Sequence, residues 1–320
     1  TLLKYYDDPE INDASAFVLL DSMLFIPFEI CSPENKLKAL EFAAGVSARK
    51  VTEIKISALR CAKYAIESDN SPALVRFAER IIRNSRGMNG ISAVYLKYKI
   101  LEAAGDQTLE SDKCSSMLYS KENGISDIFL ENLKTDTPWV IKAVNIELLL
   151  DRLEQGMEEE LLHITTHLSN LLKVSERVTV RHSAGKALLS VIQRLPLDQR
   201  NEVVIELTRG LEIGEYQFSK YIPEYLGELG LFLHPNELDE LISELEKQTE
   251  STNDRISSVA LDTVGVVVRK YSDYRTRFVE KDKAYDERLE RLLGILLRGL
   301  GNYHQVVCQE AFEVIGQHIF

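Results

Sequence analysis

The sequence has 320 residues, of which 45% are hydrophobic and 28% are charged, and its glycines and prolines together number 24. This composition excludes an intrinsically disordered chain, and the scarcity of turn-forming residues argues against an all-β fold. The formal net charge of -12 repels a phosphate backbone and therefore argues against nucleic acid as the partner.

The acidic charge is concentrated in the second half. Residues 1–135 carry 17 basic and 19 acidic side chains, whereas residues 136–320 carry 21 basic and 31 acidic ones. A protein or peptide partner of basic or mixed charge suits such a surface. We expect irregular helical repeats in 1–135 and regular repeats in 136–320, continuous with the first part.

The cysteines and the apolar segments indicate a cytoplasmic protein without a membrane span. No cysteine lies in a CxxC pair, so neither zinc nor redox chemistry is indicated, and scattered cysteines are typical of reduced thiols. The apolar stretch 16–30 is broken by Asp21, Pro27 and Glu29 and is too short to cross a bilayer. No signal peptide is visible. The apolar run 314–320 and the start without methionine suggest a fragment of a longer polypeptide.

A helical core pattern repeats along the chain as pairs of apolar residues four positions apart. In chain order the pairs are Leu20/Leu24, Ala58/Ala62, Leu96/Ile100, Ile146/Leu150, Ala184/Leu188, Ile222/Leu226, Ala260/Val264 and Ala311/Ile315. The step is 38 residues, apart from insertions near 105–117 and 272–284. Such a period predicts an all-α fold, a right-handed α-solenoid of about eight antiparallel helix pairs that share one core.

The second half gives the helix boundaries. First helices are expected at 201–214, 236–251 and 286–301, and second helices at 176–195, 215–233, 253–271 and 302–320. Breaks fall at Pro196, Gly214, Pro235 and Asn302. Pro223 lies inside a predicted second helix and should kink it.

The second helices resemble those of the HEAT/armadillo type of helical repeat. A glycine follows the second core residue at Gly227, Gly265 and Gly316, and Val180-Arg181 precedes Ala184 as Val-Arg often opens that helix in the family. The resemblance covers residues 137–320 and implies that the second helices line a concave face. The family includes scaffolds, transport receptors and regulatory subunits, besides a few enzymes such as phycobilin lyases and DNA glycosylases, so the resemblance alone does not assign a function.

Four arginines form the most pronounced local charge feature. Arg76, Arg80 and Arg83 are spaced to share one face of a predicted helix at 72–85, and Arg86 follows. Guanidinium groups could hold phosphate or an acidic peptide there. The alternative is a solvated outer face paired with Glu79 and neighbouring repeats.

Two aromatic features are interpreted as packing. Tyr95 and Tyr98 alternate with lysines, as on a surface that stacks nucleic-acid bases, but helical spacing favours contacts between repeats. Trp139 follows Thr137 and Pro138, which predict an N-cap and a first helical residue, and should anchor the start of the fourth repeat's second helix.

Glu160, His163 and His167 form a weak candidate metal site. Their spacing places them along one helix face, with His182 as a distant fourth ligand. The pattern is not HExxH and lacks a general base, so we favour a plain helix surface and expect no cofactor.

The insertion at 272–284 contains Arg275 and Arg277, which are candidate partner contacts. Insertions in solenoids often carry such contacts, and the alternative is a tolerated mobile loop. No catalytic motif for serine hydrolases, P-loop enzymes or dinucleotide-binding enzymes occurs.

The sequence therefore favours a non-catalytic protein-interaction scaffold or regulatory module. Its predicted binding surface is the concave face. The alternative is an enzyme, or a domain that handles phosphate, nucleotide or nucleic acid, built on the same helical frame.

Overall fold

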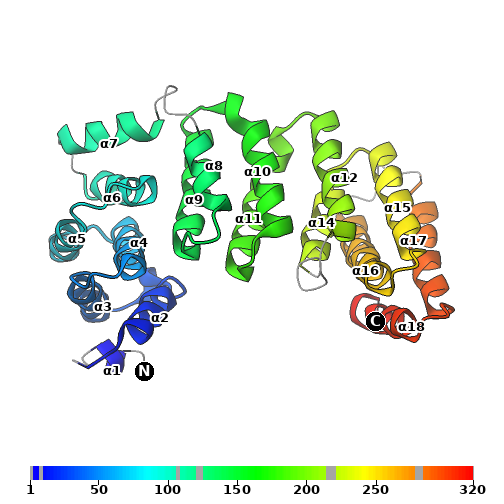
Figure 1. The fold of residues 1–320 in the computed structure, drawn as a ribbon, viewed down its shortest axis with the longest axis horizontal. Helices are drawn as coiled ribbons and strands as arrows, with labels where there is room; N and C mark the ends of the chain where they lie inside the picture. Colours follow the sequence, from blue (N-terminus) through cyan, green and yellow to red (C-terminus); the bar gives the residue numbers. More distant parts are fainter. Residues whose placement is uncertain are drawn as a thin grey trace. The chain divides into compact units, whose positions relative to one another are not determined.

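The computed structural model describes residues 3–6, 10–105, 109–119, 125–213, 221–277 and 284–319. Within these ranges every regular element is a helix, and no β-strand occurs. The chain divides into two compact units, residues 1–156 and 157–320. Each unit is a two-layer stack of helices, so the fold is an all-α solenoid as predicted (Figure 1).

Unit 1 contains a layer of first helices and a layer of second helices. Its helices are α1 (Leu3–Tyr6), α2 (Asp13–Met23), η1 (Phe28–Ile30), α3 (Pro33–Val46), α4 (Thr52–Ser68), α5 (Pro72–Asn84), α6 (Ile91–Ala103), α7 (Leu109–Tyr119), α8 (Ser126–Leu133) and α9 (Trp139–Glu154). The first helices α1, α3 and α5 pack side by side, as do the second helices α2, α4 and α6. Helix α9 runs across the second-helix layer (Figure 1).

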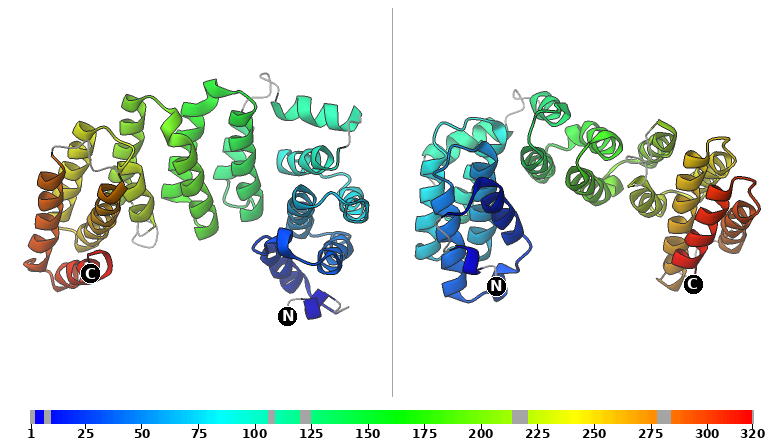
Figure 2. Two further views of the ribbon diagram at one scale, coloured as in Figure 1. Left: turned by 180° about the vertical axis from the view of Figure 1, so that it is seen from behind. Right: turned by 60° about the horizontal axis from the view of Figure 1, so that its bottom comes forward.

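Unit 2 has the same two layers. Its helices are η2 (Glu158–Glu160), α10 (Leu161–Val174), α11 (Val178–Val191), η3 (Ile192–Arg194), α12 (Leu197–Ile213), α14 (Ile222–Gly230), α15 (Pro235–Thr249), α16 (Asp254–Arg277), α17 (Tyr285–Leu300) and α18 (Gln305–His318). The first helices α10, α12, α15 and α17 form one layer, and the second helices α11, α14, α16 and α18 form the other (Figure 2).

The predicted core register is confirmed. Thirteen of the sixteen register residues are buried, and the remaining three, Leu24, Leu150 and Ile315, are half-buried. Their helices are α2 (with Leu24 as its C-cap), α4, α6, α9, α11, α14, α16 and α18. Within each unit the register residues are buried against neighbouring helices, because a single helix pair cannot cover its apolar stripe alone.

Glycines bring neighbouring second helices of unit 2 together. A Cβ built on Gly185 would lie 2.5 Å from the ring of Tyr225, and one on Gly227 would lie 2.5 Å from Val266 Cγ1. One on Gly265 would lie 2.3 Å from Val314 Cγ1. Only a residue without a side chain permits this approach, since no real Cβ contact is so short. The glycine after the second core residue is therefore a packing device between successive repeats.

Several predicted boundaries need correction. Helix α14 begins at Ile222, so Pro223 lies in its first turn, where proline is tolerated, and it does not kink a helix interior. Pro138 is the N-cap of α9 and Trp139 its first residue, one position later than predicted. The insertion at 272–284 begins as helix, since α16 extends to Arg277. Most of the insertion near 105–117 lies in α7.

None of the helices in the described ranges combines the length and the apolar character that crossing a lipid bilayer requires.

Candidate binding surfaces

The arginine stripe lies on α5, a first helix of unit 1. The opposite face of α5 buries Leu74, Ala78 and Ile81, which leaves Arg76, Arg80, Arg83 and Arg86 exposed. Arg76 Nε donates to the carbonyl of Pro72 at 3.2 Å. Within the described residues none of the four forms an ion pair with a carboxylate. The stripe is therefore an exposed row of guanidinium groups, and among the described residues the pairing with Glu79 that the alternative included does not occur.

The second-helix layer of unit 1 is covered by α9. Glu147 of α9 lies 3.6 Å from Arg60 and 3.5 Å from Lys63, both on α4. One end of α9 packs against α2, where the rings of Trp139 and Phe17 meet edge to face at 5.9 Å. Trp139 thus anchors the start of the helix, as predicted. The basic face of α4 is neutralised by an acidic side chain of the same chain.

The other end of α9 is held by Asp151. Its carboxylate lies 3.4 Å from Lys99 Nζ on α6 and accepts a hydrogen bond from the Tyr119 hydroxyl on α7. Burial, followed by the contact with Asp151, raises the pKa of Tyr119, so Tyr119 stays protonated and donates. The face of unit 1 that repeat geometry would offer to a ligand is occupied by its own helix.

Three second helices of unit 2, α14, α16 and α18, carry acidic residues at one repeat position. The repeat position two residues after the first core residue is uncharged in unit 1 except for Arg60, and in unit 2 it is Lys186 on α11. On the three following second helices it is acidic: Glu224 on α14, Asp262 on α16 and Glu313 on α18. Glu224 and Glu313 are exposed, and Asp262 is half-buried. With the half-buried Glu310 on α18, we call this set the acidic face. No described helix of unit 2 crosses it as α9 crosses the layer in unit 1.

Like charges crowd part of the acidic face. Burial, then the charges of Asp262 and Glu313, raise the pKa of Glu310. Burial also raises the pKa of Asp262, against the opposing influence of His318, whose Nε2 lies 3.5 Å away. A cationic group near these carboxylates would relieve the repulsion. The face is not uniformly negative, because Lys270 pairs with Glu228 at 2.6 Å.

An aromatic cluster lies beside the acidic face. His182 Nδ1 on α11 lies 2.5 Å from the hydroxyl of Tyr225 on α14, and the ring of Tyr221 meets His182 at 5.9 Å. Burial, then the charges of Glu224 and Glu228, raise the pKa of Tyr225 to about 12. The phenol therefore remains protonated at neutral pH. His182, considered above as a distant metal ligand, lies in this aromatic cluster.

The candidate metal site is wrong. His163 is exposed whereas His167 is 5% exposed, so the two imidazoles do not present one ligand face. Burial lowers the pKa of His167 to about 4, which makes it a neutral residue of the helix core. Glu160 stands at the end of η2. No group of three or more potential metal ligands assembles among the residues that the structure covers.

The remaining candidates are resolved only in part. Arg275 and Arg277 stand in the last turn of α16, and their side chains lie outside the described residues. Tyr95 is buried in the layer of second helices, in agreement with packing. A hollow in unit 1 is lined by Lys36, Asp69, Asn70 and Ala103, among others, but Lys36 and Asp69 pair with each other at 3.1 Å.

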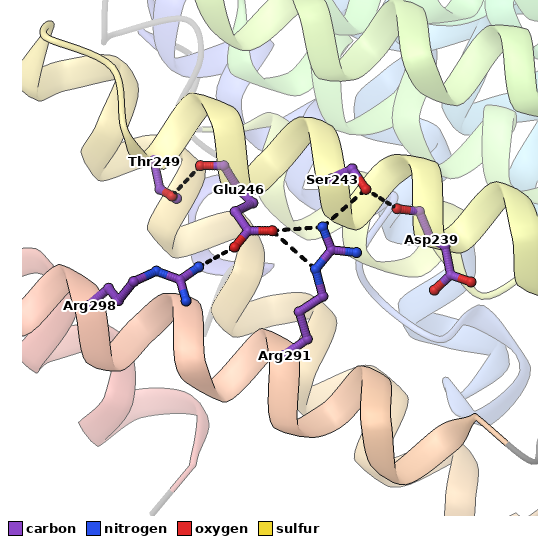
Figure 3. Close-up of polar contacts among 6 residues, drawn as sticks. All are labelled: Asp239, Ser243, Glu246, Thr249, Arg291 and Arg298. Carbon is purple, nitrogen blue, oxygen red and sulfur yellow. Dashed lines mark hydrogen bonds and ion pairs between the residues drawn. The ribbon is translucent and has the colours of Figure 1, made fainter.

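Clustered arginines elsewhere in the protein have partners within the fold. Figure 3 shows Arg291 and Arg298 of α17 converging on Glu246 of α15, with Arg291 Nη2 2.6 Å from its carboxylate and 3.1 Å from Ser243 Oγ. Hydrogen bonding from Arg291 lowers the pKa of Glu246. This cluster joins two first helices and is structural. The arginines of α5 lack such a counterpart.

Comparison with known proteins finds distant structural neighbours and no family. No family model matches the chain, and no curated protein matches it. Among solved structures it is similar to the karyopherin Kap121p bound to the extreme C-terminus of the protein phosphatase Cdc14p, with 11% identity, 98% of this chain and 37% of that chain covered, and a TM-score of 0.44. A model of the full-length AP-3 complex gives 12% identity, 96% and 51% coverage, and a TM-score of 0.41.

The chain thus spans little more than a third of the karyopherin chains and about half of the AP-3 chain.

Proposed function

We propose that this protein is an interaction scaffold of the HEAT type, working in the cytoplasm, and that the acidic face of unit 2 binds a protein segment of basic or mixed charge. The carrying observation is the recurrence of a carboxylate at one repeat position on three successive second helices, Glu224, Asp262 and Glu313. Repetition along a solenoid suits an extended ligand that contacts several repeats at once.

Unit 1 supports this proposal by example. There a helix of the chain itself lies across the second helices, and the contact pairs Arg60 and Lys63 with Glu147. The second-helix layer of this fold can therefore accommodate a polypeptide segment of complementary charge. On α14, α16 and α18 of unit 2 the charge is acidic, so the complementary segment is basic.

The four cysteines support the cytoplasmic assignment. All of them are free thiols, as expected of a protein kept in a reducing compartment.

The test is binding of a short synthetic peptide rich in lysine and arginine, with a glutamate-substituted peptide as its control. The variant combines Glu224→Gln, Asp262→Asn and Glu313→Gln. We expect the full chain to bind the basic peptide and the variant to bind it at least about tenfold more weakly, since each lost charge pair contributes about 0.5–1 kcal/mol.

A matched variant neutralises three exposed carboxylates of the first-helix layer, Glu202→Gln, Glu240→Gln and Glu287→Gln. It has the same net charge as the test variant, so it should bind like the unmodified protein. Equal loss in the two variants would reduce the effect to net charge and contradict the proposal.

A second candidate function rests on the arginine stripe of α5. Four exposed guanidinium groups without a carboxylate partner favour an anionic ligand, such as phosphate or an acidic peptide. Alanine at Arg76, Arg80 and Arg83 should abolish binding of a phosphorylated or glutamate-rich peptide while leaving the helix content by circular dichroism unchanged. Unchanged binding would assign the stripe to a solvated surface.

A further inference from the structure

The protein carries two exposed surfaces of opposite charge, the arginine stripe in unit 1 and the acidic face in unit 2. The stripe lies on the outer face of α5, because the opposite face of that helix buries Leu74, Ala78 and Ile81. None of its arginines forms an ion pair with a carboxylate of the described residues. Each surface therefore has the charge that would neutralise the other.

The acidic face has unused capacity for hydrogen bonds. In the described part of the chain Glu224 and Glu310 have no basic partner within ion-pair distance. The side chain of His318 is 7% exposed and lies beside Asp262, with Nε2 3.5 Å from the carboxylate, yet neither of its ring nitrogens has a hydrogen-bond partner there. Guanidinium groups would supply positive charge and N–H donors to these carboxylates.

Unit 1 shows how a charged helix lies across second helices in this protein. Helix α9 packs against both α4 and α6. Its Glu147 meets Arg60 and Lys63 on α4. Its Asp151, four residues later, meets Lys99 on α6. Residues four apart share one face of a helix, so a single row of charges on the crossing helix serves two second helices.

The arginine stripe has the spacing of the α9 carboxylates and the opposite charge. Arg76 and Arg80 are four residues apart, as Glu147 and Asp151 are. An α-helix rises about 1.5 Å per residue, so the stretch from Arg76 to Arg86 spans about 15 Å. Packed helices lie about 8–10 Å apart. A row of this length therefore reaches carboxylates on two or three neighbouring second helices, such as α14, α16 and α18.

We propose that the arginine stripe of one copy of the protein binds the acidic face of a second copy. The inference rests on the proposed function, because it uses the same acidic face and names its occupant. It also gives the arginine stripe an anionic ligand, so one contact accounts for both surfaces. The contact joins two different surfaces, so repeated association produces a ring or an open chain of copies.

The contact depends on ionic strength in a way that its charges define. Each copy has a formal net charge of -12, which repels other copies at long range. At about 0.15 M ionic strength the Debye length is about 8 Å, so repulsion between distant charges is screened more than attraction between groups in contact. At about 1 M the Debye length is about 3 Å, and the contact itself weakens.

Sedimentation equilibrium of the full chain over a range of protein concentrations tests the proposal. We expect the average mass to rise above that of a single copy in about 0.15 M salt and to return to it in about 1 M salt. The variant Arg76→Glu, Arg80→Glu and Arg83→Glu should associate at least about tenfold more weakly, because it loses three charge pairs and adds repulsion.

A matched variant separates the arginine stripe from net charge. Lys50→Glu, Lys113→Glu and Lys134→Glu reverse three exposed lysines of unit 1 that lie outside α5. This variant has the same net charge as the stripe variant, and we expect it to associate at least about tenfold more tightly than the stripe variant. Equal association of the two variants would contradict the proposal.

Mixing two variants separates a direct contact from a loss of folding. The face variant combines Glu224→Lys and Glu313→Lys with Asp262→Asn, since Asp262 is half-buried. Neither the face variant nor the stripe variant should self-associate, and circular dichroism of each should show unchanged helix content. In an equimolar mixture the new glutamates on α5 meet the new lysines on α14 and α18, so association should return.

A mixture that stays monomeric, or self-association that survives reversal of the arginine stripe, would overturn the inference. An unmodified chain that stays monomeric but binds the lysine- and arginine-rich peptide would overturn this inference and leave the proposed function standing. A chain that neither self-associates nor binds the peptide would contradict both. If the copies associate as proposed, the peptide should dissociate them, because it competes for the same acidic face.

Discussion

The two units share a core and differ in what lies on their second helices. In unit 1 the layer of α2, α4 and α6 carries basic residues and is covered by α9, whose Glu147 and Asp151 pair with them. In unit 2 the equivalent layer carries Glu224, Asp262 and Glu313, and the described part of the unit places no helix across it. One repeat framework thus supports a basic surface covered by a helix of its own unit and an acidic surface that no described helix of its own unit covers.

The largest expected effect concerns the hydrophobic core that both units have. Leu96 in unit 1 and Leu188 in unit 2 occupy register positions and are both 0% exposed. Leu96→Asp and Leu188→Asp should each cost about 4 kcal/mol or more, because each places an unpaired charge in the core. Thermal unfolding checks this. An unchanged Tm in either variant would contradict the register in that unit.

The next largest effect is a different pH dependence of stability in the two units. All six histidines lie after residue 156, and burial lowers the pKa of His167 to about 4. In the unfolded chain His167 is protonated near pH 6.5, whereas in the folded chain it stays neutral until the pH approaches 4. The stabilising contribution is therefore fully present above pH 6.5 and decreases as the pH falls toward 4. The loss should reach about 3 kcal/mol and appear first in unit 2.

Hydrogen exchange as a function of pH measures this loss of stability in each unit. His167→Gln should flatten the dependence, whereas His163→Gln, an exposed neighbour on the same helix, should not. Opening of unit 1 before unit 2 on acidification would be the opposite outcome.

Removing a carboxylate should destabilise the covered surface. Asp151→Asn deprives Lys99 of its charge partner and weakens the hydrogen bond from Tyr119, at a cost of about 1–2 kcal/mol. Asp127→Asn on α8, which is exposed, is the control and should be neutral. Urea denaturation gives both values, and equal stabilities would mean that Asp151 does not hold α9.

Removing a carboxylate from the acidic face should instead increase the stability of the protein. Glu310 has a raised pKa because of burial and of repulsion from Asp262 and Glu313. Glu310→Gln should therefore stabilise the protein at pH 7 by about 0.5 kcal/mol. The same change should weaken binding of the basic peptide. If Glu310 were a purely structural carboxylate, its removal would destabilise the protein. A decrease in Tm would therefore argue against a binding role.

Periodicity predicted the fold because every repeat solves the same packing problem. Apolar pairs four residues apart located the second helices, and the glycines after them marked the close contacts at Gly227 and Gly265. Boundaries were less predictable. A proline such as Pro223 is compatible with a kink or with a helix start, and only the neighbouring structure decides.

The binding surfaces were harder to predict. The arginine stripe follows from spacing on one helix, and its exposure agrees with that prediction. The acidic face depends on residues 38 and 51 positions apart, and no local motif signals them. Aligning the repeats on their core and reading the position two residues later would have revealed it. The metal-ligand spacing of His163 and His167 did not predict a shared ligand face, because helical spacing does not specify which residues the core buries.

The central claim is that the second helices of unit 2 form an open surface for a basic segment, whereas those of unit 1 are already occupied. Hydrogen exchange of the full chain with and without the lysine- and arginine-rich peptide tests it most directly. We expect the peptide to protect α14, α16 and α18 and to leave α2, α4 and α6 unchanged. Protection confined to unit 1, or none in unit 2 at saturating peptide, would contradict the account.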